Sequence, residues 1–157
     1  MNREQRLARV VALLLPLALL AGALGSQWLG GLYPCEMCHW QRWPHYLAVV
    51  LAGLAFVIPG RVTQRALVLL AALAIAVSGA IGAYHAGVEY DWWQGVTSCA
   101  STVAAGGPGD ALARIMAAPM IRCDVAQWTL AGISLAGFNA LLSLGGALAI
   151  GILMRKR

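Results

Sequence analysis

The stretch VVALLLPLALLAGALGSQWL, residues 10–29, carries no charged side chain and is long enough to cross about 30 Å of hydrocarbon as a helix. Three further apolar runs follow, at about residues 44–59, 66–84 and 128–154. The chain of 157 residues is 61% hydrophobic and only 11% charged, a composition that soluble domains of this size do not have. We therefore predict an all-α integral membrane protein, in which residues 1–157 form a single domain, a four-transmembrane-helix bundle.

The basic residues predict the orientation of this bundle. Eight of the eleven lie before the first run, between the second and third, or after the fourth: Arg3, Arg6, Arg9, Arg61, Arg65, Arg155, Lys156 and Arg157. Since basic segments stay on the cytoplasmic side, both termini should be cytoplasmic, and residues 30–43 and 85–127 should form two outer loops. All Trp and Tyr lie at or near the outer ends of the runs, as an interfacial belt would. The net charge of +5 reflects this bias, so we expect contact with membrane lipid and none with nucleic acid.

The N-terminus also resembles a secretory signal peptide, because three arginines precede an apolar stretch that contains Ala21-Gly22-Ala23. Its apolar run of about 20 residues is longer than the usual core of such a peptide, about 7–15 residues. We therefore expect this segment to be retained as a helix. Cleavage would not change the side of the membrane on which the two outer loops lie.

The long outer loop has its own predicted structure. Gly106-Gly107-Pro108-Gly109 is a flexible breaker. Asp110 can then cap a short helix, residues 111–118, which mixes apolar residues with Arg114 and should lie on the membrane surface.

Small residues in the third and fourth runs predict a close contact between two helices. Asn139, at membrane depth, should form a hydrogen bond between helices, although polar residues there are also candidates for function. The small residues are Ser78 and Gly82 in the third run, and Gly132, Ala136 and Ala140 in the fourth.

All four cysteines lie in the two outer loops: Cys35 and Cys38 in the short one, Cys99 and Cys123 in the long one. Outside the cytoplasm such thiols persist as disulfides, and four cysteines allow three pairings. A bond between Cys35 and Cys38 would be typical of a redox-active dithiol. A bond between Cys99 and Cys123 would be either a structural staple or, because both flank a flexible segment, a bond open to exchange with an incoming thiolate. The presence of a second redox pair favours exchange.

Neighbouring residues should tune Cys38. A helix should begin at about residues 40–43, since proline at position 44 is tolerated in a first helical turn. A thiol beside a helix N-terminus and a cation has a lowered pKa. Arg42 supplies the cation, unless it only reaches outward to water. His85, at the outer end of the third apolar run, lies within reach of the same outer membrane surface. Glu89, four residues later, could orient His85 or pair with it.

Other chemistries compete for the first pair. Cys35-x-x-Cys38-His39 matches the attachment pattern of c-type haem, but haem would leave Cys99 and Cys123 unexplained, and the loop is too short to enclose a macrocycle. Support for a four-cysteine zinc site is weaker still, because Cys99 and Cys123 lack the short spacing of a zinc knuckle. We therefore expect no metal. A non-catalytic membrane protein with stapled loops is a further alternative.

The chain as a whole resembles the DsbB family of quinone-dependent membrane thiol oxidases. The motifs that carry the resemblance are Pro34-Cys35-x-x-Cys38-x-x-Gln41-Arg42, Tyr84-His85 ahead of Cys99, and Cys123-Asp124-x-x-x-Trp128 leading into Gly132-Ile133-Ser134. The vitamin K epoxide reductase family, a four-helix bundle with an outward Cys-x-x-Cys, is the alternative. Its second cysteine pair precedes the redox motif, whereas here Cys35 and Cys38 come first.

The resemblance implies a protein-dithiol:quinone oxidoreductase of the bacterial inner membrane, with periplasmic cysteine loops. Cys99–Cys123 would accept electrons from a DsbA-like periplasmic protein of the thioredoxin fold, with Cys99 forming the mixed disulfide. Cys123 would pass the reducing equivalents to Cys35–Cys38.

The resemblance also implies a quinone site. Cys38 would contact the ring of a quinone, ubiquinone in the first place and menaquinone as the alternative, drawn from the quinone pool. Arg42 would stabilise the negative charge there, and His85 would line the same site. His39, beside the pair, could shift the pKa of its cysteines.

Overall fold

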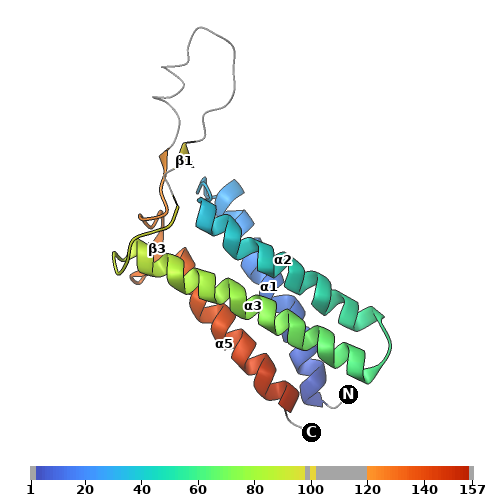
Figure 1. The fold of residues 1–157 in the computed structure, drawn as a ribbon. Coiled ribbons are helices and arrows are strands. Elements are labelled where there is room, and N and C mark those ends of the chain that lie inside the picture. Colours follow the sequence, from blue (N-terminus) through green and yellow to red (C-terminus); the bar gives the residue numbers. More distant parts are fainter. Residues whose placement is uncertain (1–2, 98–99, 102–119, 156–157) are drawn as a thin grey trace.

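The computed structural model describes residues 3–97, 100–101 and 120–155. Its main elements are the four helices α1 (Arg3–Trp28), α2 (Glu36–Val57), α3 (Arg61–Glu89) and α5 (Leu135–Arg155). Figure 1 shows the helices packed side by side, with the start of α1 and the end of α5 at the same end of the bundle. The prediction of four packed helices is confirmed.

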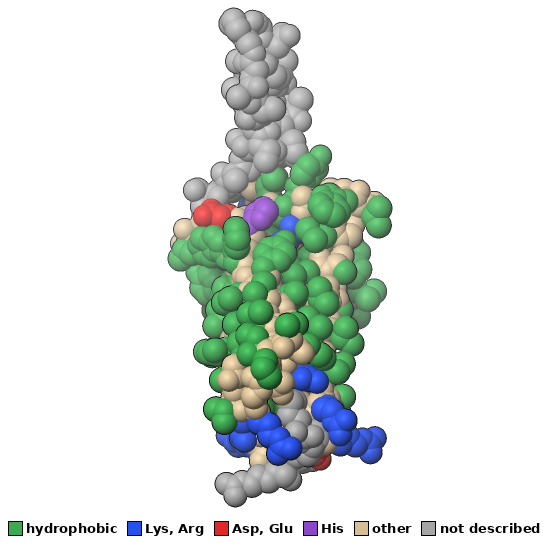
Figure 2. Space-filling model, turned by 90° about the vertical axis from the view of Figure 1, so that its right-hand side faces the viewer, with side chains coloured by type: hydrophobic (Ala, Val, Ile, Leu, Met, Phe, Trp, Pro, Cys, Tyr) green, Lys and Arg blue, Asp and Glu red, His purple; other side chains and the backbone are tan. Residues whose placement is uncertain are grey.

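Three of the helices, α1, α3 and α5, are long and apolar enough to span a membrane. In α2, the first turns hold the polar part of the cysteine motif, including Glu36, Gln41 and Arg42, and this lowers its hydropathy. Figure 2 shows hydrophobic side chains along the length of the bundle and most Lys and Arg side chains gathered at one end. The surface thus has the charge pattern of a membrane protein.

The start of α2 differs from the prediction. The helix begins at Glu36, so Pro44 lies inside it and not in its first turn. Cys35 is the N-cap residue, and its Sγ accepts a hydrogen bond from the Cys38 N–H. Proline inside a membrane helix is tolerated where neighbouring helices compensate for the lost hydrogen bond, and α1 likewise contains Pro16. Cys38 therefore lies within the first helical turn and not ahead of the helix.

The start of the last helix also differs from the prediction. Strands β3 (Thr129–Leu130) and β4 (Ile133–Ser134) pair as an antiparallel hairpin, and α5 begins only at Leu135. The two turn residues, Ala131 and Gly132, have positive φ angles of 50° and 79°, as a tight two-residue hairpin requires. Gly132 is thus a turn residue, and the predicted helix contact at this position is wrong.

A second pair of short strands lies at the same end of the bundle as the β3–β4 hairpin. Strand β1 (Ala100–Ser101) pairs antiparallel with β2 (Met120–Ile121), and Figure 1 shows them at the end opposite the termini. The Tyr90 hydroxyl ties the β3–β4 hairpin to the end of α3, since it donates to Gly132 O at 3.0 Å and accepts from Ser134 N–H at 2.8 Å. The predicted surface helix at 111–118 and the breaker at 106–109 lie outside the described residues.

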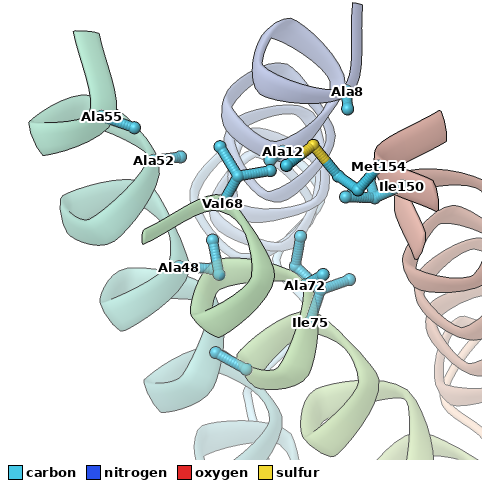
Figure 3. Close-up of a cluster of buried hydrophobic side chains, with 12 residues drawn as sticks. Ala8, Ala12, Ala48, Ala52, Ala55, Val68, Ala72, Ile75, Ile150 and Met154 are labelled. Carbon is cyan, nitrogen blue, oxygen red and sulfur yellow. The ribbon is translucent and has the colours of Figure 1, made fainter. Parts of the chain in front are cut away.

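Helices α3 and α5 are in close contact, as the small residues predict. A Cβ atom on Gly82 would lie 3.0 Å from Ala136 O and 3.1 Å from Ala140 N. The buried core nearer the termini is also built mostly from small side chains of all four helices. Figure 3 shows Ala12, Ala52, Val68, Ala72, Ile75 and Ile150 converging there. Close backbone approach of this kind stabilises helix pairs in lipid, where the hydrophobic effect does not drive association.

Candidate active site

The cysteine pair begins α2. Cys35 is 2% exposed and Cys38 is half-buried. Their Sγ atoms lie 2.7 Å apart, because the three-residue spacing places the N-cap side chain directly over the first turn. Both residues precede the predicted membrane-spanning segment, which starts at residue 44. The two sulfur atoms are therefore placed to form and break a disulfide with little movement.

The two thiols have different acidities. The hydrogen bond with Cys38, together with burial, raises the pKa of the Cys35 thiol. The same hydrogen bond lowers the pKa of Cys38, against the opposing effect of burial, and Arg42 contributes less in the same direction. When the pair loses one proton, the negative charge therefore falls on Cys38, which is the better nucleophile and leaving group.

His85 comes from the far end of α3 to meet this pair. Its Nε2 atom lies 3.6 Å from Cys35 Sγ and 3.7 Å from Glu89 Oε1, and its side chain is buried. The structure thus brings His85 to the cysteines, with Cys35 as its nearest sulfur, and places Glu89 beside it. The second oxygen of Glu89, Oε2, is buried and has no hydrogen-bond partner among the described residues.

Cys123 also reaches the first pair, from the other loop. It is buried in one cluster with Cys35, Met37, Val88 and Ile121, against which Cys38 packs. On its other side Cys123 lines a second cavity, with Trp92, Trp93 and Asp124 among the lining residues. Cys99 lies outside the described residues, so the predicted Cys99–Cys123 bond remains a prediction.

A cavity of about 210 Å³ opens beside the dithiol. The predicted residues Cys35, Cys38, Arg42 and His85 all line it. Its remaining walls are mostly apolar side chains of α1 and α5, such as Leu19, Leu20, Leu135 and Phe138. The structure thus gathers around one cavity the three residues that the family resemblance assigned to a quinone site, Cys38, Arg42 and His85, together with Cys35.

The Arg42 guanidinium is held by α1. It donates to Gln27 Oε1 at 2.7 Å and to Ala23 O at 3.1 Å. These bonds fix the cation at the cavity wall, and they exclude the alternative that the side chain only reaches outward to water. His39, in contrast, is exposed and does not line this cavity.

A buried polar network that sequence reasoning missed continues from the site into the bundle. Gln41 Nε2 lies 2.8 Å from His85 Nδ1, and Gln41 Oε1 accepts from Asn139 Nδ2 at 2.8 Å. His45 Nε2 lies 2.9 Å from Asn139 Oδ1. Asn139 does form hydrogen bonds between helices, as predicted. Gln41 and His45 could have been found from their spacing, since residues 38, 41 and 45 share one helix face.

These groups suit a small organic ligand better than a zinc ion. The donor atoms of Cys35, Cys38 and His85 lie within 4.8 Å of one another, so deprotonated they could hold a thiophilic cation. Two zinc-bound thiolates stand about 3.8 Å apart, given Zn–S bonds of about 2.3 Å, and the observed 2.7 Å is shorter. The cavity is mostly apolar, as sites for small organic ligands are, and two of its lining residues, His45 and Glu89, each hold a buried atom, Nδ1 and Oε2, with no hydrogen-bond partner among the described residues.

Comparison with known proteins agrees with this chemistry. Residues 5–153, nearly the whole chain, match the family model of disulfide bond formation protein DsbB. Comparisons with curated proteins and with solved structures gave no match. The chain therefore belongs to the DsbB family, whose members are membrane proteins that act in disulfide bond formation through thiol oxidation.

Proposed function

We propose that the protein re-oxidises a DsbA-like periplasmic dithiol protein and passes the electrons to a membrane quinone. One observation carries the proposal: Cys123 of the long loop and Cys35 of the short loop lie in one buried cluster, directly beside an apolar cavity. A relay between two cysteine pairs requires that one cysteine of each pair lie close to the other pair. Delivery of electrons to a lipid-soluble ring requires the cavity.

The relay begins with the donor protein. A donor thiolate attacks Cys99; the donor–Cys99 bond forms, the Cys99–Cys123 bond breaks, and Cys123 leaves as a thiolate. Cys123 then attacks Cys35, its neighbour in the cluster; the Cys123–Cys35 bond forms and Cys38 leaves as a thiolate. The lowered pKa of Cys38 makes it the better leaving group of the pair.

Two further exchanges complete the transfer. The second donor thiolate attacks the mixed disulfide and releases the oxidised donor from Cys99. Cys99 then attacks Cys123, which restores the Cys99–Cys123 bond and releases Cys35. The net result is one disulfide in the donor and a reduced Cys35–Cys38 pair, with two electrons and two protons moved.

The first pair then returns to its disulfide. A quinone bound in the cavity would accept the two electrons and two protons that Cys35 and Cys38 give up. Arg42, held by α1, lines the same cavity as Cys38 and makes a small contribution to the lowered pKa of Cys38. His85 holds its Nε2 toward Cys35 and Glu89. Apolar walls from α1 and α5 would pack against the ring of a bound quinone. Ubiquinone and menaquinone both fit this description.

The same proposal places the chain in the bacterial inner membrane. All four helices, α2 included, would cross the bilayer, with both termini in the cytoplasm. The basic end of the bundle in Figure 2 is the end that carries the termini, and the cysteine cluster lies at the other end. The active site would thus face the periplasm, where its donor is found.

The test is quinone reduction by the purified protein with a reduced DsbA-like donor. Absorbance of the quinone and the free thiols of the donor are followed together, under anaerobic conditions. We expect one quinone reduced for each donor dithiol oxidised. Donor oxidation without quinone consumption would contradict the proposal.

A further inference from the structure

His45 is a buried, ionisable residue to which the relay gives no role. It lies on α2 two turns after Cys38, is 3% exposed, and lines the same cavity as the dithiol. Its Nε2 atom contacts Asn139 Oδ1 at 2.9 Å and Ser143 Oγ at 3.4 Å. Its Nδ1 atom is buried and has no hydrogen-bond partner among the described residues.

Backbone carbonyls fix the direction of the hydrogen bonds around His45. Ser78 O can only accept, so the amide nitrogen of Asn139, 3.2 Å away, must donate to it. Asn139 Oδ1 is therefore an acceptor, and it also accepts from the Ser143 hydroxyl at 3.0 Å. It follows that His45 donates through Nε2–H.

The surroundings of His45 indicate a neutral ring. Both groups that it contacts, the Asn139 amide and the Ser143 hydroxyl, are neutral. The cation Arg42 lines the same cavity, and a second buried positive charge nearby would be unfavourable. A neutral ring with its proton on Nε2 presents a lone pair at Nδ1, which can accept a hydrogen bond and cannot donate one.

From this we infer that His45 Nδ1 accepts a hydrogen bond from a hydroxyl group of the reduced quinone, and so makes the cavity bind the hydroquinone more tightly than the quinone. The inference rests on the proposed function. An oxidised quinone offers only carbonyl acceptors, which a lone pair cannot satisfy. A hydroquinone offers the O–H donor that Nδ1 lacks. His45 is thus a binding residue that favours the reduced product and raises the midpoint potential of the bound ring.

The test measures binding and not turnover. The protein carries Cys38→Ser so that no electrons pass, and anaerobic dissociation constants are measured for a short-tailed ubiquinone in its oxidised and reduced forms. His45→Leu should weaken hydroquinone binding about three- to tenfold, the range for one lost hydrogen bond, and leave quinone binding within about twofold. A tenfold rise in the ratio of the hydroquinone dissociation constant to the quinone dissociation constant corresponds to a fall of about 30 mV in the two-electron midpoint potential of the bound ring.

Two further variants separate hydrogen bonding from packing. His45→Asn keeps an acceptor on Cγ where Nδ1 lies, and should restore at least part of the preference. Ser143→Ala removes a buried hydroxyl that does not line the cavity, and should leave the ratio of the two constants unchanged.

The other outcomes overturn the inference. Equal weakening of both forms by His45→Leu would show a packing effect, and no change would show that Nδ1 does not meet the ligand. Greater weakening of the quinone would show that His45 donates. If the protein with His45 intact binds neither the quinone nor the hydroquinone, both the proposed function and the inference are wrong. If that protein binds them but His45→Leu leaves the preference for hydroquinone unchanged, only the inference is wrong.

Discussion

The Nε2 atom of His85 lies 3.6 Å from Cys35 Sγ, although fifty positions separate the two residues in the chain. The other ring nitrogen, Nδ1, lies 2.8 Å from Gln41 Nε2, and the same amide nitrogen donates to Met37 O at 3.1 Å. Because Met37 O can only accept, Gln41 donates to Nδ1 and His85 carries its proton on Nε2, toward the sulfur. Gln41 thus orients His85 against the dithiol.

Replacement of Gln41 by Leu should disturb both the fold and the site. Asn139 and His85 would each lose a buried partner, so the free energy of unfolding should fall by about 1–3 kcal/mol. Donor-dependent quinone reduction should fall as well. Thermal unfolding in detergent measures the first effect. Gln64→Leu, a matched control at the other end of the bundle, removes one hydrogen bond to Ile58 O and should leave activity unchanged. Equal losses in the two variants would contradict a role for Gln41 in orienting His85.

The two thiols of the first pair should differ in their pH profiles. In the reduced protein with Cys99→Ser and Cys123→Ser, alkylation of Cys38 should begin at lower pH than that of an ordinary thiol, because its pKa is lowered by the hydrogen bond from Cys35. Cys35 should react only at higher pH, since its pKa is raised. Alkylation rates at each site, read by mass spectrometry, measure this order.

Removal of the Cys35 side chain tests whether Cys35 lowers the pKa of Cys38. Cys35→Ala removes the donor that stabilises the Cys38 thiolate, so the midpoint of Cys38 alkylation should move to higher pH. A midpoint that stays in place would show that the hydrogen bond between the thiols does not set the acidity of Cys38.

A disulfide between the two loops should form when one cysteine of each pair is replaced. In the variant with Cys38→Ser and Cys99→Ser, the remaining Cys35 and Cys123 lie in one buried cluster and should form a disulfide on mild oxidation. Proteolysis in the chain between them, followed by reducing and non-reducing gels, detects the bond. The variant with Cys35→Ser and Cys99→Ser is the matched control, since Cys38 lies at the edge of the cluster and should form the bond more slowly. Equal rates would contradict the placement of Cys123 against Cys35.

Helix contact at Gly82 should be sensitive to a single methyl group. Gly82→Ala would place a Cβ 2.9 Å from Asn139 Nδ2 and 3.0 Å from Ala136 O, so α3 and α5 must separate. We expect a loss of about 1–3 kcal/mol in stability. Gly53→Ala in α2 is the control, because nothing lies within 4 Å of its added Cβ. It should be neutral or stabilising by up to about 1 kcal/mol. A stable Gly82→Ala variant would show that the helices pack less closely than described.

The sequence predicts the four helices because each apolar run must satisfy its backbone polar groups internally. The grouping of Cys38, Arg42 and His85 in one site comes from the resemblance to the DsbB family, and the structure places all three at one cavity. The start of α2 could not be predicted from Pro44, because tertiary contacts decide whether a proline is tolerated within a helix. The hairpin at Gly132 escaped prediction because its strands are only two residues long. Contacts between distant residues, such as His45 with Asn139, follow from helix packing and carry no local signal.

Electrons should enter the protein at Cys99–Cys123 and leave through Cys35–Cys38. Quinone reduction by three proteins, each given either a reduced DsbA-like donor or dithiothreitol, tests this order of transfer. Wild type should use both reductants. The variant with Cys99→Ser and Cys123→Ser should lose activity with the protein donor but keep it with dithiothreitol, which can reduce the first pair itself. Cys38→Ser should use neither. Quinone reduction by Cys38→Ser, or full activity with the protein donor after loss of Cys99 and Cys123, would contradict this order of electron transfer.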